Sequence, residues 1–559
     1  MIDRIRKRFC EMPYEILDNM IIANRRPHTP SVESLERCSD GRETGAYYFL
    51  ARYFDMIDDV QAEGIVSEII KLQNTDESDR LYGCMRWYRE EPYIFDTNGA
   101  FFVLLPFALA YVLCENKMTA GEKDGIRLML ERGGKWFQKE CAGPIYYTNK
   151  ITSDGAILAL ISKATGKYKE ECRDFWNDWT EYADELGWGW GENISDCYSL
   201  ITLNALSAAC LAAPDEGIKV KIEQKRQELL EYVSFHNGKE FIPSIRSYNF
   251  SGDINYGGAV YKTLLKPELI VNFADLMSAV VINISAASSE AFGNSPAKSV
   301  KTQRIFKDSY AYTWKGDGLR LGSVSKFPAM PGCYQNDNWG LGWQSMPVSA
   351  MLEGEYVSFL RFRTKVNGNT HSHPAQDKHS AFLYNRLFED NAIPDYQTRA
   401  AQNENILVAI RSISHIANTA EFVCDEWCIP GDRDVEIYET DNAVWYVVDN
   451  KIAVFPLNGV FAKSNTREKP TVKILKENGF TTISAIIYEG ASTLLIAEYT
   501  EAAWIVTASK NVTEYLDKIK ITDEKITDRT VPRMPCKQKR KITVSDGAKS
   551  AVLEYDPYN

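Results

Sequence analysis

The segment SSEAFGNSPAKS, residues 288–299, divides the chain into two parts with different sequence patterns. Its small and polar residues, with one Gly and one Pro, are typical of a linker. Before it, apolar residues at three- and four-residue spacing predict helices at Gly99–Cys114, Ile126–Phe137, Asp154–Thr165, Tyr198–Ala213 and Leu264–Ala286. After it, alternating or β-branched runs predict antiparallel strands, including Tyr310–Trp314, Tyr356–Arg363, Ile406–Ile410, Asp434–Tyr438, Ala443–Val448, Ile452–Phe455, Thr481–Tyr488, Ser492–Tyr499 and Trp504–Val506.

An all-α part followed by an all-β part predicts two domains. Many helices with short connections favour an α/α bundle or toroid for residues 1–290. The β-rich remainder favours a large antiparallel β-sandwich for residues 300–559. No strict short repeat occurs, which argues against a solenoid.

Composition and charge limit the classes of function. The chain has 559 residues, of which 45% are hydrophobic and 25% charged, as in ordinary globular proteins. A net charge of −12 argues against a broad nucleic-acid-binding surface. Aromatic residues reach 12%, which suits the stacking faces of a sugar-binding cleft or an aromatic-rich core.

Cysteine spacing and the N-terminal sequence predict the compartment. The 12 cysteines are scattered without a CxxC pair, a pattern of reduced intracellular proteins. The first twenty residues contain no apolar run of a secretory signal, and the apolar run Ala100–Cys114 is too short to span a bilayer. We therefore expect a cytoplasmic protein without a membrane partner, or a secreted one if the chain is a mature form. Whether it forms a homo-oligomer is left open.

Three of the 6 histidines lie in THSHPAQDKHSAFLY, residues 370–384. An HxH pair on an extended strand places His371 and His373 on one face, which suits metal ligands or a catalytic base beside a ligand. Exposed loop histidines are the alternative interpretation.

Two further segments combine polar residues with the predicted start of a helix. GWGWGENISDCYSLITLNAL, residues 187–206, contains Trp188, Trp190, Glu192 and Tyr198. Trp and Gly at a helix start can form a stacking platform with close backbone approach, although the tryptophans could equally fill the core. PIYYTNKITSDGAILALISKATG, residues 144–166, places Asn149 and Lys150 before an apolar helix, where they could simply belong to a helix N-cap.

Together these segments resemble the heparinase II/III-like and alginate lyase group of polysaccharide lyases. That group pairs an incomplete α/α toroid with a β-sandwich. Its Asn before an Ala/Leu-rich helix is similar to Asn149, and its Tyr opening a helix about fifty residues later is similar to Tyr198. Its HxH before an apolar strand resembles His371 and His373. Here Ser199 follows the Tyr, where the group usually has a His or a bulky residue, so the subfamily and the substrate stay open.

The resemblance implies β-elimination next to a uronic acid in an oligosaccharide or polysaccharide. Asn149 would hydrogen-bond the uronate carboxylate, and Tyr198 with His371 would supply the base and the acid. No cofactor would be required. Some relatives hold a structural zinc, for which the candidate ligands here are His373, Asp390 or Asp395, and His415.

Additional residues are candidates for glycan binding, because cations suit a polyanion and aromatic rings suit sugar faces. Besides Lys150, Trp188, Trp190 and Glu192, the candidates are Arg246, Arg361, Arg363, Lys365, Lys262, Arg386 and Arg399, with Tyr256 in residues 247–262 and Trp339 in residues 335–347.

Two other functions remain open. A glycoside hydrolase on a helical toroid would need two carboxylates across the bond, for which Asp154, Glu192 and Asp253 are candidates. Hydrolysis would give the HxH segment no role. A non-catalytic glycan-binding protein would use the aromatic residues alone.

Overall fold

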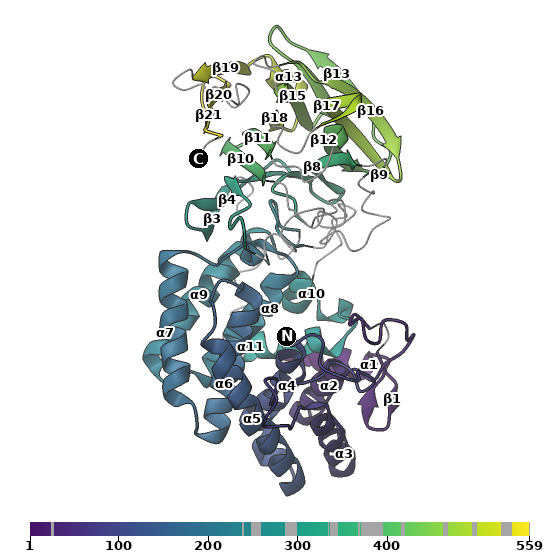
Figure 1. Cartoon of the computed structure of the whole chain (residues 1–559), viewed down its shortest axis with the longest axis vertical. Helices are drawn as coiled ribbons and strands as arrows, with labels where there is room; N and C mark the ends of the chain where they lie inside the picture. The colour runs from purple at the N-terminus through teal and green to yellow at the C-terminus, as the bar shows by residue number, and fades with distance from the viewer. Residues whose placement is uncertain are drawn as a thin grey trace. The chain divides into compact units, whose positions relative to one another are not determined.

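The computed structural model describes residues 1–23, 27–237, 240–247, 259–285, 299–333, 335, 345–366, 369–370, 395–414, 420–461, 468–494, 500–526 and 539–557. The chain forms two compact units (Figure 1). Unit 1 comprises Met1–Leu186, Tyr198–Gly238 and Ala259–Gly293, and unit 2 comprises Gly187–Cys197, Lys239–Gly258 and Asn294–Asn559. Unit 1 is helical and unit 2 consists mainly of antiparallel strands, which confirms the predicted fold class.

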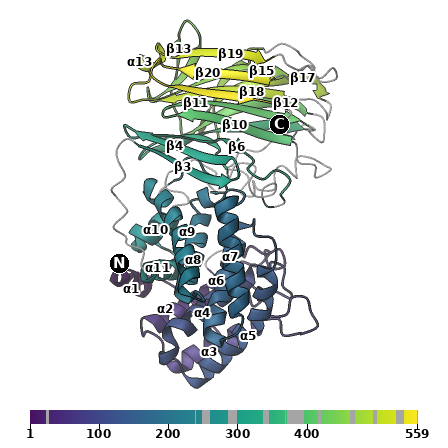
Figure 2. The same cartoon turned by 90° about the vertical axis from the view of Figure 1, so that its left-hand side faces the viewer.

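The helices of unit 1 form two layers that alternate along the chain. The inner helices are α2 (Gly41–Tyr53), α4 (Gly99–Cys114), α6 (Thr148–Thr165), α8 (Tyr198–Ala212) and α11 (Phe273–Ile284). Each packs on the next, and α11 also packs on α2, so these five close a ring. Against them lie α3 (Asp59–Ile69), α5 (Ala120–Cys141), α7 (Lys169–Glu185) and α9 (Glu216–Phe235), with α1 (Ile2–Glu11) and α10 (Ala259–Leu265) beside α11 (Figure 2).

Burial explains which helices are inner. α4 and α6 are apolar or small on nearly all sides, as a helix enclosed by others must be. Gly99–Lys117 is long and apolar enough to cross a membrane by length and composition, but 72% of that window is buried inside the structure, as in a core helix. The outer helix α7 buries Cys172, Phe175 and Trp176 on one side and exposes charged residues on the other.

One predicted helix is wrong. The apolar pattern over Leu264–Ala286 predicts a continuous helix, but α10 ends at Leu265 and α11 begins at Phe273. Pro267 cannot donate the backbone hydrogen bond that a continuing helix needs. Asn272 then caps α11, because its side chain accepts a hydrogen bond from Asp275 N at 2.7 Å.

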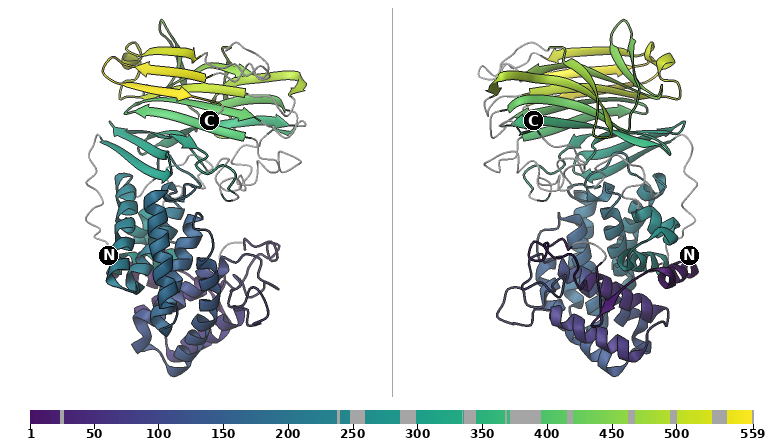
Figure 3. Two further views of the ribbon diagram at one scale, coloured as in Figure 1. Left: turned by 60° about the vertical axis from the view of Figure 1, so that its left-hand side comes forward. Right: turned by 90° about the vertical axis from the view of Figure 1, so that its right-hand side faces the viewer.

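Unit 2 is a sandwich of two large antiparallel sheets (Figure 3). The nine-stranded sheet has the strand order β16-β17-β12-β8-β7-β5-β4-β3, with β9 paired to β8. The seven-stranded sheet has the order β13-β14-β15-β18-β11-β10-β6. Strands of the first sheet are β3 (Ser299–Phe306), β4 (Ser309–Gly316), β5 (Leu319–Val324), β7 (Val348–Leu352), β8 (Tyr356–Val366), β9 (Asn369–Thr370), β12 (Ala420–Pro430), β16 (Thr471–Glu477) and β17 (Phe480–Leu494). Those of the second are β6 (Lys326–Phe327), β10 (Asp395–Asn403), β11 (Ile406–Ser414), β13 (Val435–Glu439), β14 (Val444–Val448), β15 (Ile452–Phe461) and β18 (Thr500–Ala508).

The core of the sandwich follows from strand alternation. Leu360, Trp427 and Ile483 of the nine-stranded sheet pack against Leu407 and Trp504 of the seven-stranded sheet. A third sheet covers the other face of the seven-stranded sheet with a second apolar cluster. It consists of β19 (Lys520–Ile526), β20 (Lys539–Ser545) and β21 (Ser550–Tyr555), next to the short helix α13 (Thr513–Leu516). A small hairpin of β1 (Ile16–Leu17) and β2 (Met20–Ile21) lies in unit 1.

Candidate active site

Asn149 lies in the first turn of the inner helix α6. It is the second residue of that helix and is 7% exposed. The residue at the N-cap position is Tyr147, whose side chain makes no capping hydrogen bond. Asn149 is therefore not the N-cap residue of α6. Helix capping does not explain why an asparagine occupies this position.

Tyr198 opens the neighbouring inner helix α8. Lys163, near the end of α6, donates from Nζ to the carbonyl oxygen of Leu211, near the end of α8, at 2.6 Å. The two helices pack against each other and their C-terminal ends meet, so they run parallel. The rise per residue of a helix then places Asn149 and Tyr198 at nearly the same position along the two helix axes. The axes of packed helices lie about 8–10 Å apart. Tyr198 is half-buried.

Lys150 lies between two carboxylates. Its Nζ is 2.5 Å from Glu140 Oε2, at the end of α5, and 2.5 Å from Asp154 Oδ2, one turn further along α6. Burial opposes the ammonium charge, but the two carboxylates outweigh it and raise the pKa of Lys150. Burial also raises the pKa of Asp154 to about 6, against the opposing effect of Lys150. This cluster fixes the first turn of α6 to α5, while a contact of Lys150 with substrate stays a prediction.

In unit 2, Trp190, Glu192 and Arg246 lie together. Arg246 Nη1 is 2.6 Å from Glu192 Oε1, and the guanidinium carbon is 5.4 Å from the centre of the Trp190 ring. Glu192 is 0% exposed and Arg246 5%. Arg246 has φ +52, a backbone conformation that costs energy in a non-Gly residue and often marks a functional site. Its backbone is held by Ser195 Oγ, which donates to the carbonyl oxygen of Arg246 at 2.7 Å.

The tryptophans of the Gly-rich segment are buried. Trp188 is 3% exposed and Trp190 is 0% exposed. Trp188 N donates to the Ile305 carbonyl oxygen at 2.7 Å, and a Cβ on Gly187 would lie 2.6 Å from that oxygen. This close backbone approach requires glycine. Their burial agrees with the interpretation that the two tryptophans fill the core. Stacking of these rings on a sugar stays a prediction, and it would require that the rings become exposed.

Unit 2 contains two buried carboxyl groups that no pattern in the sequence predicts. Asp196 is 0% exposed and Glu240 is 1% exposed. Burial raises the pKa of Asp196 from its ordinary value of 3.8 to about 7. The buried carboxyl group of Asp196 therefore keeps its proton up to near neutral pH. Since 44 residues separate Asp196 from Glu240, only the fold brings these residues together.

Asp196→Asn should make the protein more stable than wild type at pH 8 and about equally stable at pH 5. The folded state binds the Asp196 proton more tightly than the unfolded state does. Wild-type stability therefore falls as pH rises from about 4 towards the raised pKa, by up to about 1.4 kcal/mol per pH unit. Thermal unfolding should show a midpoint several degrees higher for the variant at pH 8. Asp178→Asn, on the exposed side of α7, should leave the pH dependence unchanged. Equal curves for wild type and Asp196→Asn would refute a raised pKa of Asp196.

Several predicted site residues lie outside the described residues. They are His371, Tyr256 and Trp339, the metal-ligand candidates His373, Asp390 and His415, and also Asp253 and Arg386. Within the part of the chain that the structure describes, no group of three or more His, Cys, Asp or Glu residues could hold a metal ion. The predicted zinc site therefore stays a prediction. Arg363 is described and lies on β8 in unit 2.

No family model matches the chain, and no curated protein matches it. Among solved structures, it is similar to a mutant of the heparan sulfate lyase HepC from Pedobacter heparinus, at 11% identity and TM-score 0.39, covering 92% of this chain and 82% of that chain. It is also similar to the Streptomyces coelicolor A3 chondroitin AC lyase in complex with chondroitin sulphate, at 9% identity and TM-score 0.44, covering 97% and 83%. Endoglucanase CelQ from Clostridium thermocellum matches at 10% identity and TM-score 0.23, covering 93% and 91%. The first two of these solved structures are lyases that, by their names, act on polysaccharides.

Proposed function

We propose that this chain is a lyase that cleaves a glycosidic bond next to a uronic acid by β-elimination. The observation that carries the proposal is the placement of Asn149 and Tyr198 at the same end of two adjacent, parallel inner helices. An amide and a phenol about one helix spacing apart can contact the carboxylate and the glycosidic oxygen of one sugar residue. The segments that contain both residues also resemble motifs of uronate lyases.

The proposed reaction begins with the C5 proton of the uronate. A base removes this proton, and the electron pair moves onto the carboxylate, which becomes enolate-like. Asn149 donates hydrogen bonds to the carboxylate and stabilises the added charge. The electrons then form the C4–C5 double bond and expel the glycosidic oxygen, which takes a proton from an acid. Tyr198 is the proposed acid. Either His371 is the base, or His371 is a cation that favours the tyrosinate, which then removes the C5 proton itself and passes it to the glycosidic oxygen. No water is consumed and no cofactor is proposed.

The surroundings of two of the three candidate carboxylates, Glu192 and Asp154, disfavour hydrolysis, and Asp253 lies outside the described residues. Glu192 is fully buried and paired with Arg246, so its carboxylate is engaged in an ion pair and covered by protein. Asp154 has a pKa near that of a general acid, but it is 2% exposed and its oxygen is 2.5 Å from Lys150 Nζ. Both therefore serve structural ion pairs, while Asn149 and Tyr198 have the chemistry of elimination.

Near-ultraviolet absorbance during incubation with a panel of uronic-acid oligosaccharides and polysaccharides tests the proposal. Elimination leaves a C4–C5 double bond conjugated to the carboxylate, so absorbance should rise as the glycan is cleaved. Cleavage without absorbance would indicate a hydrolase and refute the proposal. Binding of glycans without any cleavage would indicate a glycan-binding protein instead.

A further inference from the structure

Helices α2 and α4 of unit 1 run parallel to each other. A Cβ on Gly41, the first residue of α2, would lie 3.1 Å from Val103 Cγ2 in α4. Four residues later, a Cβ on Gly45 would lie 3.0 Å from Phe107 Cε2, which is four residues further along α4. Because the contacts advance in the same direction along both helices, the N-terminal ends of α2 and α4 lie at the same end of the ring.

The start of α4 also lies beside the start of α6. Cys84 Sγ is 3.8 Å from the carbonyl oxygen of Thr97, two residues before α4 begins. Burial raises the pKa of the Cys84 thiol to about 12, and the nearby charges of Lys150 and Asp154, in the first two turns of α6, act on the same thiol. α4 packs on α6, and α6 runs parallel to α8. The N-terminal ends of all four inner helices therefore lie at the end of the ring that carries Asn149.

A cluster of polar and aromatic side chains lies at this end, next to the starts of α2 and α4. His28 Nδ1 is 2.9 Å from Tyr88 Oη, and the His28 ring lies edge-on to Trp87, with the ring centres 4.6 Å apart. Trp87 Nε1 donates to Asp96 Oδ2 at 3.2 Å, and its carbonyl oxygen accepts from Gly41 N at 2.8 Å. Trp87 is 4% exposed and Tyr88 is 0% exposed. These buried rings hold His28 and Asp96 in place.

His28 and Asp96 form an exposed pair that a hydroxyl group can bridge. His28 Nε2 is 3.9 Å from Asp96 Oδ2, which is longer than a direct hydrogen bond. The two side chains are 44% and 31% exposed, so a ligand can reach both from solvent. When the Tyr88 hydroxyl donates to Nδ1, a neutral imidazole carries its proton on Nε2. A sugar hydroxyl then accepts from Nε2 and donates to the carboxylate of Asp96.

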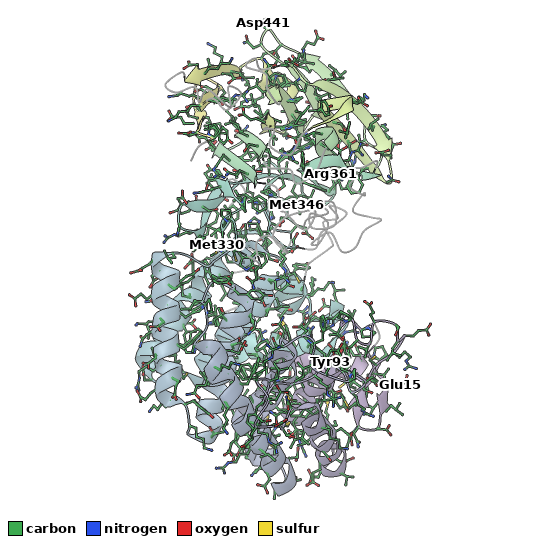
Figure 4. All side chains as sticks on the ribbon, viewed as in Figure 1. Glu15, Tyr93, Met330, Met346, Arg361 and Asp441 are labelled. Atoms are coloured by element: carbon green, nitrogen blue, oxygen red, sulfur yellow. The ribbon has the colours of Figure 1, made fainter. Side chains whose placement is uncertain are left out.

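The segment that leads into α4 also exposes two aromatic rings. Tyr93, labelled in Figure 4, is 58% exposed, and Phe95 is 55% exposed. Phe95 directly precedes Asp96 in the chain. Large aromatic rings are usually covered in a folded protein, so two exposed rings in one short segment indicate a surface for a ligand. Flat apolar rings beside a few fixed polar groups suit a sugar, which has apolar C–H faces and hydroxyl edges.

We propose that His28 and Asp96, with the exposed rings of Tyr93 and Phe95, form a subsite for the hydroxyl groups and one ring face of a sugar residue other than the one that reacts. α4 packs directly on α6, so the subsite begins about one helix spacing, about 8–10 Å, from the helix that carries Asn149. This separation suits a sugar further along the same chain. The inference rests on the proposed function, because it assumes that a glycan lies across this end of unit 1.

Two substitutions of His28 separate sugar binding from packing. An asparagine places its amide near the position of Nδ1, where it can contact Tyr88, but has no group at the position of Nε2. A glutamine places its amide nitrogen near Nε2 instead. His28→Asn should therefore weaken glycan binding about three- to tenfold, the usual effect of one lost hydrogen bond, and His28→Gln should weaken it less than twofold.

Calorimetry on the Tyr198→Phe background, where turnover is not expected, measures these effects without the proposed reaction. The probes are a hexasaccharide of alternating uronate and hexosamine and a hexauronate, and the one that binds more tightly is used for the comparison. The double variant Tyr93→Ala/Phe95→Ala should weaken binding about tenfold, because it removes both ring faces. Leu128→Ala is the matched control, since Leu128 is 41% exposed on the outer helix α5, and it should leave binding unchanged.

Several outcomes would overturn the subsite. They are a loss in His28→Gln equal to or larger than that in His28→Asn, unchanged binding in His28→Asn or in the double aromatic variant, a similar loss in Leu128→Ala, and no binding of either hexasaccharide by any form. The first of these would assign His28 to packing against Tyr88. If the expected losses occur but the protein with Tyr198 intact produces no rise in absorbance, the subsite holds and the result counts against the lyase alone.

Discussion

Tyr198→Phe should lower turnover of a uronate glycan at least about a thousandfold, because it removes the hydroxyl that is proposed to protonate the leaving oxygen. A positioned acid or base supplies about 10²–10⁴-fold, and a residue that serves in both roles would cost more. The ring stays, and with it the packing of the first residue of α8. Thermal unfolding should therefore change little while the rise in absorbance nearly disappears.

Tyr168→Phe provides the matched control for this variant. Tyr168 is also half-buried and is the N-cap residue of α7. It follows the C-terminal end of α6, so it lies at the end of that helix opposite to Asn149. Its hydroxyl has no role in the proposed chemistry, and its loss should leave turnover within about twofold. Retention of more than a tenth of wild-type turnover in Tyr198→Phe would exclude this phenol as the acid.

Local sequence patterns predicted the architecture because helices and strands bury their faces with different periods. The apolar run Gly99–Cys114 matches α4 to the residue, and the predicted start at Tyr198 matches the start of α8. The pattern failed between Leu264 and Phe273, where Pro267 and the cap at Asn272 interrupt a continuous apolar face. The third sheet, β19-β20-β21, was not predicted, although β20 and β21 alternate between buried and more exposed residues.

The candidate site was predictable only in its separate parts. Motif resemblance identified Asn149 and Tyr198, but their common height depends on the parallel packing of α6 and α8, which a spacing in sequence does not specify. The pairing of Glu192 with Arg246 joins residues 54 positions apart, and the raised pKa of Asp196 depends on burial. Both are consequences of tertiary structure that local propensity does not encode.

Asn149→Ala should lower kcat about 10²–10³-fold, because the amide is proposed to stabilise charge that develops on the uronate carboxylate only as C5 loses its proton. The effect on KM should be smaller, since the ground-state carboxylate already interacts with other cations and with solvent. Initial rates from the absorbance assay over a range of glycan concentrations separate the two constants. Asn283→Ala is the control, because this asparagine lies near the C-terminal end of the inner helix α11. A loss seen only in KM would indicate a binding role for Asn149 instead.

Asn149→Asp sharpens the same test, because it keeps the size of the side chain and replaces a donor with a negative charge. Repulsion between this carboxylate and the uronate should make its loss of kcat larger than that of Asn149→Ala. A uronate methyl ester carries no charge at that position, and its C5 proton is more acidic. If the amide acts on the carboxylate, the penalty of Asn149→Asp should shrink at least tenfold with the esterified glycan. An undiminished penalty would place the effect in the packing of the first turn of α6, where Lys150 already contacts Glu140 and Asp154, rather than in the chemistry.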